Sequence, residues 1–210
     1  MSAKANTPPA ETHLRLHAEQ QFAHELAARA AVDDRPKPPN WKLSPWAVKT
    51  YLLGGTAGNE EITPKYIGSA RLMEIAIATL ATDRALLLYG VPGTAKSWVS
   101  EHLSAPAIAG TALLRIHGTA GTDEATLRYG WNYARLLAEG PTPEALVPSP
   151  MFHAMREGKL CRIEELTRVP SEVQDTLITI LSEKTLRIPE LSSQVQAAKG
   201  FNGIATENTR

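Results

Sequence analysis

The chain has 210 residues, of which 43% are apolar and 21% charged, a composition typical of a soluble α/β domain with one sizeable core. Its 22 basic and 22 acidic residues cancel, so charge favours neither nucleic acid nor an anionic membrane as a partner. The single cysteine, Cys161, excludes an internal disulfide framework, and no stretch has the pattern of a signal peptide or a bilayer span. We therefore expect a cytoplasmic protein with no membrane partner.

The N-terminal part differs in composition from the rest of the chain. Residues 1–9 are typical of a disordered tail, and residues 10–31 predict a helix that packs on the main domain, mediates assembly or forms a solvated arm. Residues 33–40 hold three prolines in four positions and predict an extended linker. We expect a tail, helix and linker over 1–40 and a single core domain over 41–210.

Two helices and a strand are expected after the linker. Ser44 caps the first helix, which a Gly-Gly pair ends, and Ser69 caps the second, which continues to Leu80. The apolar run 85–88 then predicts a short buried strand.

A glycine-rich turn follows this strand. Four residues separate Gly90 from Ala95, Lys96 and Ser97, which is the spacing of a Walker A phosphate-binding loop. In such a loop, backbone N–H groups and the positive end of the next helix face phosphate oxygens. Lys96 would reach the outer phosphates, and Ser97 would ligate Mg²⁺. The alternative interpretation is a Gly/Pro turn followed by a chance Lys-Ser pair.

Ala95 departs from the Walker A pattern, which has glycine at that position. Its methyl group is tolerated if the local φ is negative, although it crowds the phosphates if the backbone approaches them closely. The nucleotide is expected to contact the loop and the start of the next helix, through Gly90, Val91, Pro92, Gly93, Thr94, Ala95, Lys96, Ser97 and Trp98.

The middle of the chain offers weaker signals. Residues 112–117 predict a second strand, and we interpret His117 at its end as a structural residue rather than a catalytic base, because no Ser or Cys nucleophile is placed nearby. The aromatic cluster at 129–133 could stack bases, but it lacks flanking basic residues, which favours a core or insert role. Residues 141–150 carry four prolines and predict an irregular loop.

A third strand, expected beside the loop strand, ends in two adjacent acids, Glu164 and Glu165. After a phosphate-binding loop this pattern indicates a Walker B strand, in which Glu164 organises Mg²⁺ and Glu165 polarises the attacking water. Glu164 stands where Asp is usual, and Arg162 places in the strand a charge that must find a partner. The alternative is a solvated acidic strand end.

The last segments complete the predicted sheet. Residues 170–181 predict an amphipathic helix, 185–188 a strand, and 189–199 a loop or hairpin. Residues 200–206 predict a further strand beside the loop strand. Asn208 follows it, at the kind of position where a γ-phosphate or an attacking water is sensed.

The motifs 90–97, 162–168 and 204–208, taken together, resemble those of AAA+ ATPases of the MoxR-like group, and the resemblance extends over residues 66–210. It implies a P-loop NTPase fold of three αβα layers with a mainly parallel central sheet, preceded by a helical N-terminal arm, and it implies ATP and Mg²⁺ as ligands. The resemblance assigns Lys96 and the Mg²⁺ ligand Ser97 to the Walker A motif, and Glu164 and Glu165 to the Walker B motif. It makes Asn208 the sensor-1 residue, and it implies that Tyr66 and Ile67 line the adenine.

By the same resemblance, the protein would assemble into a ring, typically a hexamer, and use ATP to remodel or mature partner proteins, often ones with a von Willebrand A domain. Members of the group continue past sensor 1 with a strand, an arginine finger and a helical lid, whereas this sequence stops at Arg210, so hydrolysis is expected to be weak. A nucleotide-gated interaction module is the alternative function. A DNA-remodelling motor would need a basic patch that the balanced charge does not indicate.

Overall fold

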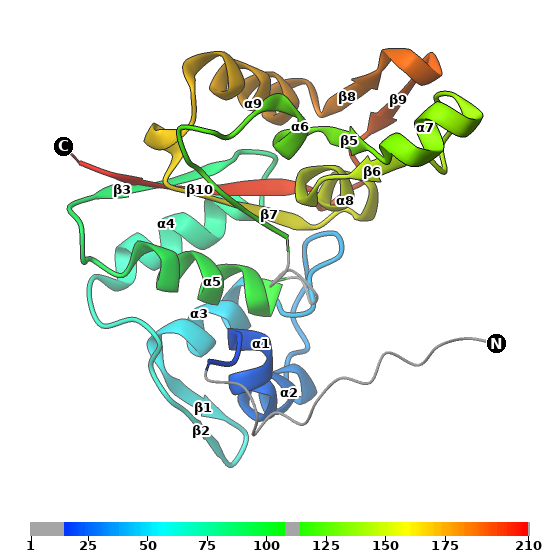
Figure 1. Ribbon diagram of the computed structural model, residues 1–210. Helices are drawn as coiled ribbons and strands as arrows, with labels where there is room; N and C mark the ends of the chain where they lie inside the picture. Colours follow the sequence, from blue (N-terminus) through cyan, green and yellow to red (C-terminus); the bar gives the residue numbers. More distant parts are fainter. Residues whose placement is uncertain (1–14, 108–113, 210) are drawn as a thin grey trace.

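The computed structural model describes residues 15–107 and 114–209. Its centre is a four-stranded parallel sheet (Figure 1). The strands run in the order β3 (Leu86–Gly90), β10 (Asn202–Asn208), β7 (Leu160–Glu164), β4 (Arg115–His117). The predicted α/β class with a parallel sheet is confirmed.

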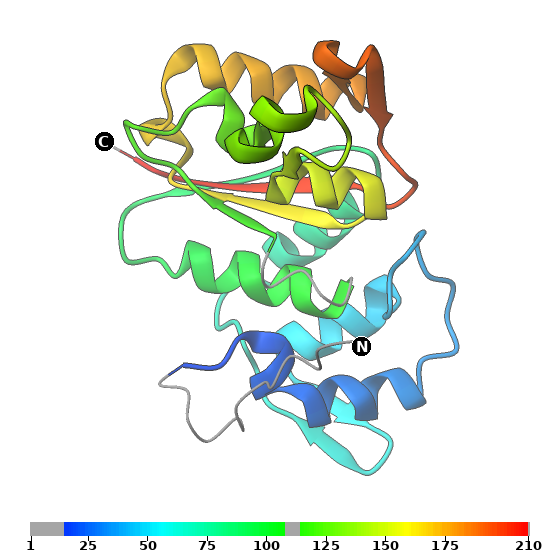
Figure 2. The ribbon, with the colours of Figure 1, turned by 45° about the vertical axis from the view of Figure 1, so that its right-hand side comes forward.

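Helices cover both faces of the sheet (Figures 1 and 2). On one face lie α8 (Pro150–Glu157) and α9 (Ser171–Glu183), and on the other lie α4 (Ala70–Leu80) and α5 (Lys96–Ala107), with α3 (Pro45–Leu53) beyond them. Each face has its own apolar cluster. Because successive strand residues point to opposite faces, Cys161 and Ile163 join the α8/α9 cluster, whereas Leu160 joins the α3/α4/α5 cluster.

The loop strand β3 is only half buried, so the prediction of a buried strand is wrong for one of its faces. Leu86 and Leu88 pack against the α3/α4/α5 cluster, whereas Leu87 and Tyr89 are 50% and 63% exposed. The reason is position: β3 ends the strand order in the described part of the chain, and the α8/α9 cluster holds none of its residues.

The order of the strands corrects a second expectation. The strand predicted to be Walker B, β7, does not lie beside β3, because β10 pairs with both of them and separates them. The expectation that β10 lies beside β3 is confirmed, with Asn208 opposite Gly90.

The N-terminal helix packs on the domain. Residues 1–9, and the first residues of the predicted helix, lie outside the described residues. Instead of one helix there are α1 (Ala18–Gln21) and α2 (Ala23–Ala31), broken at Phe22 with φ −111° and ψ 25°. Phe22 and Leu26 pack against the α3/α4/α5 cluster. Of the three possibilities, packing on the main domain is therefore the one that the contacts support.

Residues 33–40 have no helix or strand, as predicted, but both ends of the segment are held. The Asp33 carboxylate accepts hydrogen bonds from the backbone N–H and the hydroxyl of Ser44, both at 2.6 Å. The Asn40 amide donates to the carbonyl of Lys199 at 2.6 Å. Ser44 in turn caps α3 by accepting from the Ala47 N–H, as the sequence predicts. The division at residue 40 stays a prediction.

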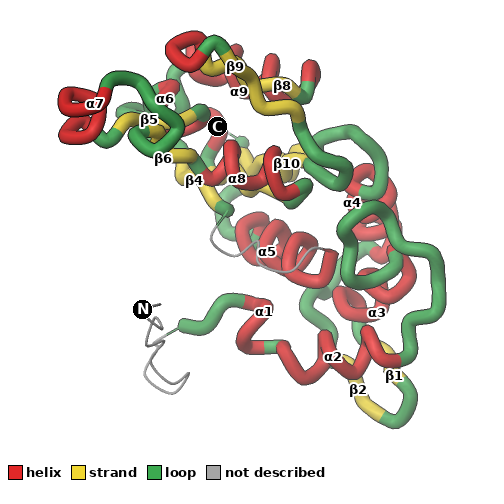
Figure 3. The backbone as a smooth tube through the Cα atoms, turned by 90° about the vertical axis from the view of Figure 1, so that its right-hand side faces the viewer, coloured by secondary structure: helices red, strands yellow, loops and turns green. Residues whose placement is uncertain are grey.

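Smaller elements surround the core (Figure 3). The strand predicted over 185–188 is confirmed, and of the loop or hairpin predicted over 189–199 the structure has the hairpin, in which residues 193–196 pair with that strand. The prediction of an irregular loop over 141–150 is wrong in part, because the strand β6 (Leu146–Pro148) lies within it. Tyr129 is buried in the α8/α9 cluster and Trp131 packs against it, as a core role predicts, whereas Tyr133 of the same aromatic cluster is 75% exposed. None of the helices in the two described ranges is long and apolar enough to cross a lipid bilayer. The remaining elements are β1 (Gly55–Ala57) paired with β2 (Glu60–Ile62), α6 (Glu124–Leu127), β5 (Tyr129–Trp131) paired with β6 (Leu146–Pro148), α7 (Tyr133–Glu139), and β8 (Thr185–Ile188) paired with β9 (Ser193–Gln196).

Candidate nucleotide-binding site

The carboxyl ends of the four parallel strands meet at one edge of the sheet. The register places Asn208 opposite Gly90 and His117 opposite Glu164. In α/β sheets this is the edge where ligands bind. The loop, the acidic strand end and the predicted sensor residue therefore share one edge, although they are far apart in the sequence.

Residues 91–95 form the loop between β3 and α5. Gly93 has φ +83°, and a Cβ built on it would meet no atom within 4 Å, so the loop leaves open space on this side. Ala95 has φ +58°, and the negative φ that would make its methyl group tolerable is not present. Left-handed backbone costs a non-glycine residue about 1 kcal/mol, and such strain occurs most often at functional sites.

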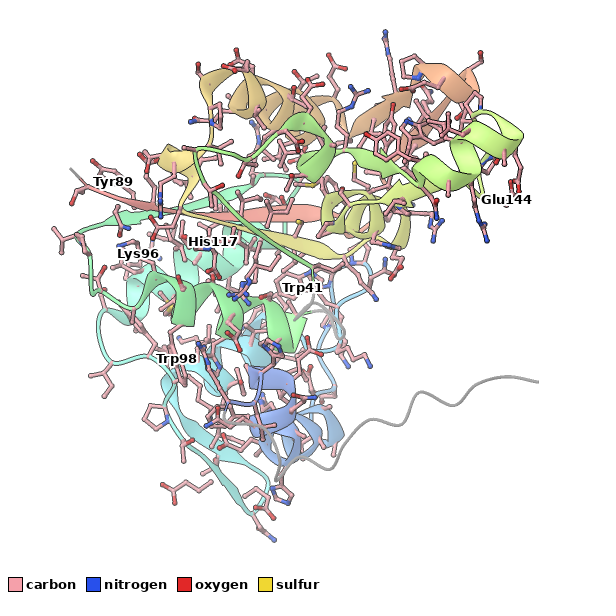
Figure 4. The ribbon with its side chains drawn as sticks, in the orientation of Figure 1. Trp41, Tyr89, Lys96, Trp98, His117 and Glu144 are labelled. Carbon is pink, nitrogen blue, oxygen red and sulfur yellow. The ribbon has the colours of Figure 1, made fainter. Side chains whose placement is uncertain are left out.

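Lys96 lies across this loop. Its ammonium donates to the carbonyls of Gly90 at 2.9 Å and Val91 at 2.7 Å, and lies 3.3 Å from the Thr94 hydroxyl. Within the described ranges no carboxylate pairs with it. The charge is thus placed at the loop with only neutral oxygens around it, and Ser97 beside it is exposed. Figure 4 shows Lys96 and His117 at the carboxyl edge.

The other residues expected to contact nucleotide differ in whether they line the space next to the loop. Tyr66 lines a groove of about 350 Å³ together with Thr94 and Lys96, next to the loop. The Ile67 side chain is 93% exposed and does not line this groove. The side chain of Trp98, labelled in Figure 4, packs along its own helix α5: its ring centroid lies 4.2 Å from that of His102, and its Nε1–H donates to the Lys65 carbonyl at 2.8 Å.

Glu165 and Asn208 are in direct contact. The Asn208 amide nitrogen lies 3.0 and 3.1 Å from the two carboxylate oxygens of Glu165. Glu165 has φ +60°, and its N–H donates to the Thr206 hydroxyl at 3.3 Å. β10 therefore holds both the backbone and the side chain of Glu165. Sequence reasoning missed Thr206, because its position in the strand pattern is an ordinary one.

Glu164 lies on the α5 face of the sheet, and its Oε1 pairs with the buried guanidinium of Arg162. Its Oε2 lies 4.0 Å from His117 Nδ1. Burial lowers the pKa of Arg162, and the charges of Glu164 and Glu101 act in the opposite direction. His117, which the sequence indicated as structural, thus borders the acidic strand end, and the partner required by Arg162 is Glu164, two residues along the same strand.

Gly118 is a supporting residue that sequence reasoning missed. Its N–H donates to the Glu164 carbonyl at 2.7 Å. A Cβ at this position would lie 2.5 Å from the Glu165 carbonyl oxygen and 2.9 Å from that of Glu164. The two acidic residues thus need a residue without a side chain next to them. A glycine directly after a predicted strand is the signal that could have indicated this close approach.

ATP and Mg²⁺ fit these residues. The loop is open at Gly93, and the Lys96 ammonium has no carboxylate partner in the described ranges. The hydroxyl of Ser97 and the carboxylates of Glu164 and Glu165 belong to the same edge of the sheet. Residues 15–107 and 114–209 contain no group of three or more His, Cys, Asp or Glu that could hold a metal by itself, so a Mg²⁺ ion would depend on the phosphates and water for its other ligands.

The fold and this edge define a P-loop nucleotide-binding α/β domain. Residues 85–210 match the family model described as the AAA domain of the dynein-related subfamily, and the chain belongs to this family of ATPase domains. The family confirms the resemblance to MoxR-like AAA+ proteins, and ATP binding is a property of the family.

The chain is also similar to individual proteins. The uncharacterized protein YehL of Escherichia coli is 48% identical over 206 residues, which are 96% of this chain and 56% of YehL. Midasin of Dictyostelium discoideum is 30% identical over 140 residues, which are 66% of this chain and 2% of midasin. A solved structure of NtrX from Brucella abortus aligns with a TM-score of 0.45 and 15% identity, over 69% of this chain and 31% of that one, a similarity too low to bear on function.

The chain spans about half the length of YehL, and also 56% of the uncharacterized protein SH1500 of Staphylococcus haemolyticus, to which it is 28% identical over 149 residues. The activity, substrates and partners of the whole protein are therefore matters for proposal.

Proposed function

We propose that this chain binds ATP with Mg²⁺ and hydrolyses it, as the core of an AAA+ ATPase that remodels or matures other proteins. The observation that carries the proposal is the meeting of three parts at one sheet edge: the Lys96 loop, the acidic end of β7 and the Asn208–Glu165 contact. A nucleotide-binding loop alone would need only the first part. Hydrolysis needs the other two, because an attacking water must be held and polarised.

Each residue has a role that its position supports. Lys96 would exchange its contacts with the Gly90 and Val91 carbonyls for phosphate oxygens, and Ser97 and Glu164 would hold Mg²⁺. When bound, the ion would neutralise developing charge on the phosphates. Glu165 would orient and polarise the attacking water, and Asn208 would keep the Glu165 carboxylate in place. Tyr66 would border the adenine.

The partners belong to the proposal as well. We propose self-assembly into a ring, of six subunits in the full-length protein, and a protein substrate, for which a von Willebrand A domain is the leading candidate. The support is the resemblance to MoxR-like proteins. The sequence, with equal numbers of acidic and basic residues, supports no nucleic-acid partner.

The test is ATP turnover by the unsubstituted chain, Lys96→Ala and Glu165→Gln under identical conditions. We expect turnover to fall to background in both variants, because the first loses phosphate binding and the second loses the polarising carboxylate. Equal rates for all three proteins would remove the catalytic claim.

Two observations favour a second candidate function, a module that binds ATP or ADP to order a partner surface with little or no hydrolysis. Ala95 holds a left-handed conformation in the loop, and Glu164 is engaged by Arg162. Calorimetric titration with nucleotide, run beside turnover on the same sample, separates the two functions. Tight binding without turnover in the full-length protein would favour the second.

A further inference from the structure

Arg162 is a charged residue in the middle of the Walker B strand, and its side chain is only 2% exposed. It points to the α5 face of the sheet, as Leu160 and Glu164 do, because alternate strand residues share a face. Burying a guanidinium is costly unless it is paired and hydrogen-bonded. The contacts of the guanidinium therefore indicate the role of its charge.

The guanidinium connects β7 with the first turns of α5. One terminal nitrogen pairs with Glu164 Oε1 and lies 3.4 Å from the Ser97 carbonyl, and Nε donates to the Ser100 hydroxyl at 3.2 Å. The other terminal nitrogen lies 3.7 Å from Glu101 Oε2. Ser97, Ser100 and Glu101 belong to the helix that begins at the phosphate-binding loop. Arg162 thus contacts both halves of the candidate site at once.

Glu101 is itself fixed, so it gives Arg162 a rigid second anchor. Its side chain is 7% exposed, and it accepts the buried N–H of Ala18 at 2.9 Å and a hydrogen bond from Arg15 at 3.2 Å. The N-terminal segment therefore closes over the carboxylate that Arg162 faces on α5. A guanidinium held in this way has little freedom to follow Glu164 if that side chain moves.

Arg162 and Glu164 are the two residues of β7 that depart from the Walker B pattern, and they pair with each other. Glu164 is one methylene longer than the usual Asp and has more conformations to lose. The pair with Arg162 fixes Oε1, and Oε2 lies toward the carboxyl edge, 4.0 Å from His117 Nδ1. An aspartate would need no such support, since it is shorter.

We propose that Arg162 is a positioning residue, which orients Glu164 toward a Mg²⁺–nucleotide complex and keeps it in register with Ser97 on α5. This inference rests on the proposed function, because it takes Glu164 as the carboxylate on the metal side. Arg162 acts through Glu164, as the outer partners of metal ligands do in other sites, where their loss weakens metal binding by about 10- to 100-fold.

The test measures the affinity of a non-hydrolysable ATP analogue in Mg²⁺ and in EDTA, and compares the ratio of the two affinities between variants of the 210-residue chain. In Arg162→Leu we expect the ratio to fall about tenfold. Glu164→Asp alone should also lower it, because the shorter side chain leaves the buried guanidinium of Arg162 without its pair at the acidic strand end. The double variant Arg162→Leu/Glu164→Asp should recover most of the ratio, because it restores an aliphatic residue beside an aspartate.

Arg115→Leu is the matched control. Arg115 is the register partner of Arg162 on β4, but its side chain is exposed, so the same substitution should leave the ratio unchanged. Far-ultraviolet circular dichroism establishes that each variant is folded. If Arg162→Leu does not fold, Arg162→Lys replaces it: lysine keeps a charge but cannot make the forked contacts of arginine, so the ratio should still fall.

The outcomes separate the two proposals. If Mg²⁺ does not raise the affinity of the unsubstituted chain, both proposals are overturned. If Mg²⁺ raises it and the ratio is unchanged in Arg162→Leu or Arg162→Lys, only the role of Arg162 is overturned. A double variant whose loss is simply the sum of the two single losses also overturns it, because Arg162 would then not act through Glu164.

Discussion

The side-chain amide of Asn208 donates to both carboxylate oxygens of Glu165, over 3.0 and 3.1 Å, although the two residues are 43 positions apart. They come from the ends of neighbouring strands, β10 and β7. A carboxylate held at both oxygens cannot rotate freely. The contact therefore makes Asn208 the residue on which the orientation of Glu165 depends.

Replacement of Asn208 should separate hydrolysis from binding. In Asn208→Ala the carboxylate is released, and in Asn208→Asp a second negative charge lies against it. We expect ATP turnover to fall about 10²-fold in both, with nucleotide affinity little changed. Glu207→Gln, one residue earlier on the opposite face of β10, is the control and should keep turnover. Asn208 variants with unchanged turnover would show that this contact is not used in catalysis.

Ala95→Gly should stabilise the loop. Ala95 has φ +58°, a conformation that glycine adopts without strain, so the substitution should raise the free energy of unfolding by about 1 kcal/mol and tighten nucleotide binding. The matched control is Ala81→Gly at the end of α4, where φ is −73° and the same change should destabilise. Thermal unfolding and calorimetric titration measure both effects. A decrease in stability for both variants would contradict this account of Ala95.

Gly118→Ala should disturb the acidic strand end. The new methyl group would lie 2.5 Å from the Glu165 carbonyl oxygen, which must move, and we expect a loss of about 1–3 kcal/mol in stability together with a loss of turnover. Gly130→Ala is the control, since a Cβ there meets nothing within 4 Å. Chemical denaturation of the two variants should differ clearly; equal midpoints would mean that the strand end adapts at no cost.

Acid should destabilise the protein through His102. Burial lowers the pKa of His102 to about 4, from 6.5, and its Nδ1 shares a hydrogen bond of 2.9 Å with the Tyr51 hydroxyl. Between these pH values the unfolded chain binds more protons than the folded one. The free energy of unfolding should therefore fall by ~3 kcal/mol as the pH drops from 6.5 to 4, and this contribution is complete above pH 7.

His102→Gln measures this effect, because glutamine can still hydrogen-bond Tyr51 but does not titrate. Its unfolding free energy, determined by urea denaturation at several pH values, should depend less on pH over that interval than that of the unsubstituted chain. The same acid dependence in both proteins would assign the effect to other groups.

The sequence predicted the parts of the site that depend on local patterns. The Gly90 to Ser97 spacing, the acids at the end of β7 and the asparagine at the end of β10 were all visible without coordinates. Parallel strands then bring these parts to one edge, since the carboxyl ends of such strands coincide.

What the sequence could not predict depends on contacts between distant segments. The position of β10 between β3 and β7 is set by the order of the crossover connections. Hydrophobic periodicity predicts where a strand lies in the sequence, but not its place in the sheet. The bond from Asn208 to Glu165 follows from that order. The hydrogen bond from Trp98 to the Lys65 carbonyl joins segments 33 positions apart, and the φ of Ala95 is a property of the folded loop.

Arg162 lies between these two cases. The sequence showed that its charge needs a partner, and the strand pattern was sufficient to predict which residue that partner is. Residues two apart on a strand share a face, so Glu164 was the nearest acid on the same side. The contacts with Ser100 and Glu101 could not be foreseen, since they require the placement of α5 against β7.

The central claim is that ATP binds at the Lys96 loop and is hydrolysed there. Its most direct test is a calorimetric titration of ATP with Mg²⁺ into the unsubstituted chain, Lys96→Ala and Lys199→Ala, with turnover measured on the same samples. Lys199 is an exposed lysine just before β10, at the amino end of that strand. We predict binding and turnover in the unsubstituted chain and in Lys199→Ala, and loss of both in Lys96→Ala. Equal affinity in all three proteins would contradict the assignment of the site.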